Sequence, residues 1–474
     1  MEDVIFTVLD SVRRPYVLPG QLLDHALEIL AASTRYSAKV FKVHPRLFAF
    51  LVAGLRAKGW DTRWMCFSGL LKIYDKDDDD APYSVDPAEF LKNISQTLPW
   101  HLQRALDAYG PSRSDIRLAL TVSEEYDSSM RDRVVHGDLY AFGLKQAELI
   151  LKADLSVAGG ILHGSSTWMN TWRSAINKIR AKNKPEDQDA ADILDIAYLL
   201  YRRRHEEAVA LARKSITRNP EQAYFYYALS FSSDHVERLQ AEKKGLKCQQ
   251  STPFVRYQLL YQAVEHAGAM GYKWLLAASA EVTHSWEKGI ACFVSALEDA
   301  KTFVEEAPPD HRSMLHILNW LVLLSLLVRE DLSPDLMEIK DIVKKVKTAE
   351  QFAEFMGVQP DRFDFYLAQK AALKHYAQGV AEFSRVYEDL DRAKSQQASP
   401  TVTQAQTEDA LAAWLDDVRL EDGSRAFPSH CEVNRGTKVN FDSVTMYRCS
   451  WCGNPSALLK KCELSLLATL CLSC

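Results

Sequence analysis

The sequence predicts an all-α protein with a helical-repeat body and a small, separate C-terminal module. Apolar residues recur every three or four positions through most of the chain, which is typical of amphipathic helices, and very few segments alternate as strands do. Five of the nine cysteines lie after Arg448. A length of 474 residues is enough for about three domains. These observations favour a large helical body and a cysteine-rich end with a role of its own.

Residues 1–180 are expected to form an N-terminal helical region. Segments such as HPRLFAFLVAGLRAKG and FLKNISQTLPWHLQRALDAY keep the helical period. The acidic run DKDDDDAP separates two of these segments. It does not match a calcium-binding loop, because Asp80 stands at the sixth position, where that loop needs glycine. We therefore expect a solvated loop there.

The clearest helix pair lies near the start of the next region, residues 181–390. ADILDIAYLL and EEAVALARKSI each place small or apolar side chains on one helix face. The first stripe consists of Ile193, Ile196, Ala197 and Leu200, and the second of Ala208, Leu211, Ala212 and Ser215. The polar corner RRRH joins the two helices, and Pro220 ends the second one. Two antiparallel helices of this kind form one unit of a helical repeat.

This pair resembles a tetratricopeptide repeat. Small Ala208 stands where two helices must approach closely, and Pro220 follows twelve positions later. The resemblance continues more loosely into the next segment, where Tyr226 and Leu229 suit a second unit and Ser230 replaces the usual glycine. Because one helix pair cannot bury its own apolar face, several pairs are expected to stack through residues 181–390.

Composition argues against a membrane protein and against a general nucleic-acid binder. The longest apolar stretch, Met314–Val328, contains His316 and Asn319 and is shorter than the about 20 residues of a membrane span, so a buried helix is expected. The N-terminus lacks the basic-then-apolar order of a signal peptide. With 57 Lys and Arg against 63 Asp and Glu, the net charge of −6 does not attract nucleic acid. A protein of the cytoplasm or the nucleus is expected.

The composition changes after Leu390. Residues 391–408 are rich in Ser, Gln, Thr and Ala and are expected to form a flexible linker. Residues 409–444 contain one short helical pattern and then an irregular connection with Gly and Pro. This order leaves residues 445–474 as the separate cysteine-rich module.

The cysteine spacing of this module predicts a zinc site. Cys449 and Cys452 form a C-x2-C pair, Cys471 and Cys474 form another, and eighteen residues separate the two pairs. This spacing is typical of zinc sites in which two pairs of thiolates bind one tetrahedral ion. Cys462 is an alternative or additional ligand. Four thiolates leave no position for water, so the predicted site is structural and not catalytic.

The segment RCSWCGNPSALLKKC resembles the opening of the MYND zinc finger. In that family four pairs of ligands bind two zinc ions, and the resemblance implies that Cys449, Cys452 and Cys462 take the first three places. The chain departs from the family at Ser465, where a cysteine is expected, and it ends before a fourth pair. A truncated or altered finger is therefore expected. The resemblance implies binding of Pro-containing peptide segments.

Two other interpretations of the tail remain. The five thiols could all be free and reduced in a disordered tail. Alternatively the last four residues, CLSC, could form a lipid-attachment box around Cys471. Ser473 and a terminal cysteine fit that box poorly.

One short segment resembles a catalytic loop. The sequence HGDL at residues 136–139 is similar to the catalytic loop of small-molecule phosphotransferases, which implies Asp138 as a base. Gly143 stands where that loop needs asparagine, and no Gly-rich phosphate loop precedes it. The alternative is a helix start, in which Gly137 and Asp138 cap the segment LYAFGLKQAELILKA.

The sequence thus favours an interaction protein over an enzyme. We expect a helical scaffold that binds a protein or peptide partner, with a structural zinc module and no catalytic residues, nucleic acid, membrane or small-molecule substrate. The alternative is an enzyme whose site is assembled from distant helices and leaves no linear motif.

Overall fold

The structure is a computed structural model, and it describes residues 2–12, 20–75, 87–110, 113–153, 167–278, 284–358, 363–395, 460–461 and 469–470. The chain divides into two units, Met1–Asp417 and Val418–Cys474. In the second unit, the described residues form two short strands, β1 (Lys460–Lys461) and β2 (Thr469–Leu470), which pair antiparallel.

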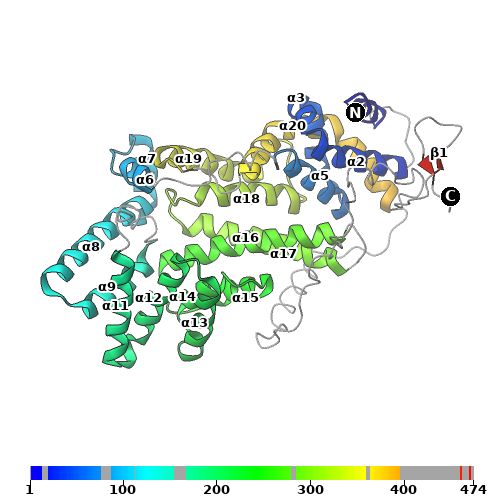
Figure 1. Cartoon of the computed structure of the whole chain (residues 1–474). Coiled ribbons are helices and arrows are strands. Elements are labelled where there is room, and N and C mark those ends of the chain that lie inside the picture. Colours follow the sequence, from blue (N-terminus) through cyan, green and yellow to red (C-terminus); the bar gives the residue numbers. More distant parts are fainter. Residues whose placement is uncertain are drawn as a thin grey trace. The chain divides into compact units, whose positions relative to one another are not determined.

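The described part of the first unit is helical (Figure 1). Its elements are α1 (Glu2–Val12), α2 (Gly20–Tyr36), α3 (Ala38–Val43), α4 (Pro45–Gly54), α5 (Trp60–Lys72), α6 (Pro87–Ile94), α7 (Trp100–Tyr109), α8 (Asp115–His136), α9 (Leu139–Lys152), α11 (Thr167–Lys182), η3 (Pro185–Asp187), α12 (Gln188–Tyr201), α13 (His205–Arg218), α14 (Ala223–Leu229), α15 (His235–Gly245), α16 (Pro253–Ala278), α17 (His284–Glu306), α18 (Met314–Val328), η4 (Met337–Ile339), α19 (Lys340–Met356) and α20 (Phe363–Ser395). The expected all-α body is confirmed in this unit.

Helices α8 to α19 pack mainly against helices close to them in the sequence. Each of α12 to α18 contacts the next helix, and Figure 1 shows α13, α14 and α15 beside one another below α16. A succession of neighbouring helix contacts is typical of stacked helical repeats. The tetratricopeptide type of repeat stays a prediction.

The predicted helix pair is formed by α12 and α13. The structure buries Ile193 and Ile196 on the first helix and Ala208, Ala212 and Ser215 on the second. Their side chains belong to, or lie beside, a core cluster that runs from Phe142 to Leu259. This cluster draws residues from both sides of the predicted boundary at 180–181, and the division into regions stays a prediction.

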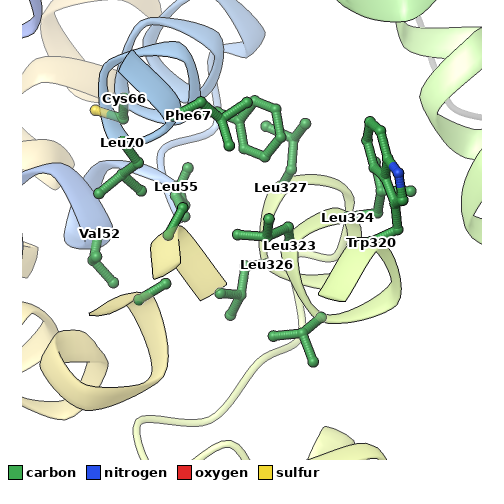
Figure 2. Close-up of a cluster of buried hydrophobic side chains, with 14 of the residues drawn as sticks. Val52, Leu55, Cys66, Phe67, Leu70, Trp320, Leu323, Leu324, Leu326 and Leu327 are labelled. Carbon is green, nitrogen blue, oxygen red and sulfur yellow. The ribbon is translucent and has the colours of Figure 1, made fainter. Parts of the chain in front are cut away.

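The predicted buried helix is α18. Every residue from Met314 to Val328 is buried, as the apolar run indicated. This helix lies in the largest core cluster, and Figure 2 shows part of it, where side chains of α4 and α5 meet those of α18. None of the described helices is both long and apolar enough to cross a membrane.

The last described helix of the first unit packs against helices from the start of the chain. Helix α20 packs along α4 and also contacts α2 and α5. Gly379 permits this approach, since a Cβ atom there would lie 2.4 Å from the carbonyl oxygen of Ala49. Tyr387 also donates a hydrogen bond to the carbonyl of Phe50, at 3.0 Å. The two ends of the helical body therefore share one core.

Helix α20 extends five residues into the segment predicted as a linker. Ion pairs explain the extension, because Lys394 Nζ lies 2.7 Å from Asp24 Oδ1 and 2.5 Å from Asp61 Oδ2. Most of the acidic run DKDDDDAP, the remaining linker and the short helix predicted after residue 408 lie outside the described residues.

Candidate peptide-binding groove

The predicted zinc ligands lie outside the described residues. These are Cys449, Cys452, Cys462, Cys471 and Cys474. In the part of the chain that the structure describes, no group of three or more His, Cys, Asp or Glu side chains could hold a metal ion. The zinc site therefore stays a prediction.

The three body cysteines differ from zinc-binding thiols. Burial raises the pKa of Cys66 and of Cys292 to about 12, and that of Cys248 to about 11. Zinc binds the deprotonated thiolate, and these thiols stay protonated at neutral pH. They are suitable control positions for any test of the tail.

The HGDL segment begins a helix. Gly137 ends α8 in the left-handed conformation, and one carboxylate oxygen of Asp138 accepts hydrogen bonds from the backbone N–H groups of Tyr140 and Ala141, at 3.0 and 3.1 Å. The capping role that the helix-start interpretation expects is confirmed for Asp138, whereas Gly137 caps the preceding helix and not this one. Gly143 has a packing role, since a Cβ atom there would lie 2.8 Å from Cδ1 of Ile179 on α11.

Two adjoining hollows lie on the helices that follow this segment. The first, which we name the arginine hollow, has a volume of about 930 Å³ and lies between the start of α13, the turn from α14 to α15, and α16. Four arginines line it, against two glutamates: Arg203, Arg204, Arg213, Arg238, Glu206 and Glu207. Its lining is therefore positively charged, in a chain whose net charge is −6.

The second hollow, which we name the aromatic hollow, has a volume of about 240 Å³. Six of its lining residues are Trp172, Tyr201, Tyr224, Tyr227, Phe231 and Phe254. The two hollows share His205 and Phe231. The rings of these two residues are stacked, with centroids 5.6 Å apart and planes 7° apart. We call the two hollows together the groove.

The corner between α12 and α13 places Arg203 at the edge of the groove. Its N–H donates to the carbonyl of Leu200, and the N–H of Arg204 donates to that of Leu199, both at 2.9 Å. This pair of bonds is the Schellman motif, which ends a helix with a left-handed residue that is usually glycine. Arg203 adopts that conformation with φ of 55°. An arginine there costs about 1 kcal/mol or more relative to glycine.

Ion pairs hold the walls of the arginine hollow. Arg213 of α13 forms two bonds with the carboxylate of Glu237 on α15, at 2.8 and 2.7 Å. Burial opposes the charge of Glu237, but hydrogen bonds from Arg213 and Ser232 outweigh this effect and lower its pKa. Arg204, which precedes α13, is paired with Glu207 in the first turn of that helix, at 2.5 Å.

Two arginines remain available to a ligand. Among the described residues, none forms an ion pair or hydrogen bond with the exposed side chain of Arg203. Arg238 donates through Nε to the carbonyl of Ser232, which orients its guanidinium at the turn from α14 to α15. Guanidinium groups bind carboxylates through two parallel hydrogen bonds, so these two side chains suit an acidic ligand.

A buried acid lies behind the groove. His266 of α16 lines the arginine hollow, and its ring is hydrogen-bonded to Glu242 of α15, which is fully buried. Burial raises the pKa of Glu242 to about 7, although the bond to His266 acts in the opposite direction. Lys243 and Asp299 pair next to it, between α15 and α17.

This groove was not predicted from the sequence. From the sequence, RRRH was interpreted only as a polar corner, and Tyr226 of AYFYYAL only as part of a second repeat unit. One feature of the sequence could have indicated the groove. A run of arginines stands at the end of α12, where a small residue normally ends a helix. Comparisons with known proteins found no matching family model, no matching curated protein and no matching solved structure.

Proposed function

We propose that this protein is a protein–protein interaction scaffold of the cytoplasm or the nucleus, and that its helical body binds an acidic peptide segment in the groove. The proposal includes no catalytic residue and no small-molecule substrate. Its C-terminal module folds around structural zinc held by the tail cysteines and, by resemblance to the MYND finger, takes Pro-containing segments.

The continuity of the two hollows carries this proposal. Through His205 and Phe231, a positively charged surface passes directly into an aromatic one. Protein-binding surfaces gain most of their affinity from a few aromatic and arginine side chains near the centre of the contact. A peptide with carboxylates beside one large apolar side chain matches both hollows at once.

Binding of a defined peptide tests the groove. The probe is a fluorescein-labelled peptide with four carboxylates and one tryptophan, and the readout is fluorescence anisotropy with the full chain. We expect Arg238→Ala to weaken binding about tenfold or more, which corresponds to the loss of one charge-assisted contact of about 1.5–3 kcal/mol. Arg385→Ala is the matched control, because Arg385 is an exposed arginine of α20 outside the groove.

The outcome decides between the groove and nonspecific attraction. Equal losses in Arg238→Ala and Arg385→Ala would show that the peptide responds to charge in general. The proposed function of the groove would be contradicted if this peptide and its tryptophan-free version bind neither to the wild type nor to a chain with Glu408→Gln, Asp409→Asn, Asp416→Asn and Asp417→Asn.

Native mass spectrometry of the full chain tests the zinc module. We expect bound zinc in the wild type and its loss in Cys449→Ser. Cys248→Ser is the control, since the Cys248 thiol has a raised pKa and lies in the helical body. A wild-type chain without zinc after expression in zinc-supplemented medium would contradict this part of the proposal.

A further inference from the structure

We propose that the groove is occupied by a segment of the same chain, residues 408–417, which blocks it until a competing partner displaces that segment. This inference rests on the proposed function, because it names the occupant and the regulation of the same groove. The segment lies outside the described residues, and its sequence is EDALAAWLDD.

The chemistry of this segment complements the groove. It carries four carboxylates and no basic side chain, and its apolar residues are Leu411, Trp414 and Leu415. In the short helix predicted there, positions 411, 414 and 415 share one face. The segment therefore carries one large aromatic side chain that suits the aromatic hollow, with carboxylates on both sides of it that suit the arginine hollow.

A second acidic run in the chain fits less well. DKDDDDAP has no large apolar side chain between its carboxylates, and it is attached at both ends, between α5 and α6. Residues 408–417 are attached to the described body only through the end of α20. Residues 408–417 are therefore the better match to the groove.

A succession of contacts links the end of α20 to the arginine hollow. Lys394 donates a hydrogen bond to Thr62 at the start of α5, at 3.1 Å, and Trp64 of α5 contacts Tyr272 of α16, with ring centroids 5.0 Å apart. Along α16, six residues or about 9 Å separate Tyr272 from His266, which lines the arginine hollow. Figure 1 shows α5 near the right-hand end of α16.

The connection is long enough for this path. Twelve residues, 396–407, join the end of α20 to the segment. Fully extended, they span up to about 40 Å, and the path consists of two side-chain contacts and less than two turns of α16. A tether that spans this path makes binding of the segment intramolecular, so we expect contacts too weak to hold a separate peptide to keep the groove occupied.

The test measures competition by the segment in the full chain. The probe is a labelled EDALAAWLDD peptide, and the proteins are the wild type and a variant with Glu408→Gln, Asp409→Asn, Asp416→Asn and Asp417→Asn. We expect the variant to bind the peptide at least tenfold more tightly than the wild type. The matched control, Glu421→Gln with Asp422→Asn, removes acidic charge outside the segment and should bind like the wild type.

Each outcome separates the two proposals. If the wild type and the four-site variant bind the peptide equally, the groove functions and the chain's own segment does not occupy it. If neither protein binds this peptide or the four-carboxylate probe, the proposed function itself is wrong. Added Arg238→Ala should abolish the tighter binding of the four-site variant, and retained binding would place the peptide elsewhere.

Sedimentation velocity distinguishes the same chain from a second copy. We expect the wild type to sediment as one species over a hundredfold range of concentration. Concentration-dependent dimers that disappear in the four-site variant would show that the segment binds a second copy, which would overturn the proposal of occupancy within one chain.

Discussion

Arg203 occupies the position at the end of α12 that favours glycine. Its φ of 55° is a left-handed conformation, which costs a side chain about 1–2 kcal/mol. A residue kept in such a conformation at the edge of a hollow indicates a use for the side chain. In this protein the use that we propose is contact with a carboxylate of the peptide.

Arg203→Gly should therefore stabilise the fold and weaken peptide binding. We expect the free energy of unfolding to rise by about 0.5–1 kcal/mol in urea denaturation, because glycine relieves the strain but also gains freedom in the unfolded chain. Arg203→Ala is the control, since it removes the guanidinium and keeps the strained conformation. Unchanged peptide affinity in Arg203→Gly would show that this side chain does not contact the ligand.

His311 should make the body sensitive to mild acid. Burial lowers its pKa to about 3, and Arg312 acts in the same direction, while Asp310 opposes it. In the unfolded chain its pKa is about 6.5, so below that pH the unfolded state binds the additional proton and the folded state loses stability. The loss is up to about 1.4 kcal/mol per pH unit between pH 6.5 and 3.

A comparison of pH profiles isolates this effect. We expect the free energy of unfolding of His311→Gln to fall less steeply than that of the wild type between pH 6.5 and 4.5. Buried Asp310 and Glu242 have raised pKa values and act in the opposite direction in both proteins. Parallel profiles for the two proteins would contradict the assignment to His311.

At the scale of elements, the contact between α20 and α4 depends on a missing side chain. Gly379→Ala would place a methyl group 2.4 Å from the carbonyl oxygen of Ala49, which is backbone and cannot rotate away. We expect a loss of about 1–3 kcal/mol in the free energy of unfolding, as for other overpacked cores.

Gly69→Ala is the matched control in α5. A methyl group there would meet its nearest neighbour at 3.5 Å, an ordinary contact, so the better helix propensity of alanine should leave the protein as stable or more stable. Equal effects of the two substitutions on the urea midpoint would mean that α20 and α4 do not pack this closely.

At the scale of the whole molecule, local and net charge have opposite signs. The chain has a net charge of −6, whereas four arginines and two glutamates line the arginine hollow. The net charge of the chain repels an acidic peptide, and the arginine hollow attracts it. Salt weakens both interactions. If the groove binds the peptide, its affinity should fall when NaCl is raised from 50 to 300 mM.

The sign of the salt effect is therefore informative. Affinity that rises with salt would indicate that repulsion by the whole chain dominates and that the arginines do not contact the carboxylates. A tryptophan peptide without carboxylates is the control, and its affinity should change little.

Local patterns were sufficient to predict single helices. The period of ADILDIAYLL and EEAVALARKSI predicted α12 and α13, and the apolar run Met314–Val328 predicted the buried helix α18 with the same bounds. Asp138 was placed correctly at a helix start, as one of two interpretations. These features depend on residues close in the sequence, so the periodicity and capping preferences of those residues are enough.

Residue patterns were enough to predict the helical class of the body and its clearest helix pair, and they supply the cysteine spacing on which the zinc prediction rests. The groove and the closing contact of α20 became visible only when the helices were placed in three dimensions. Arg203 and His266 meet at one hollow, and Gly379 meets Ala49, because helices distant in the chain pack together. Such contacts depend on the shapes of both partners, and the period of either segment does not contain that information.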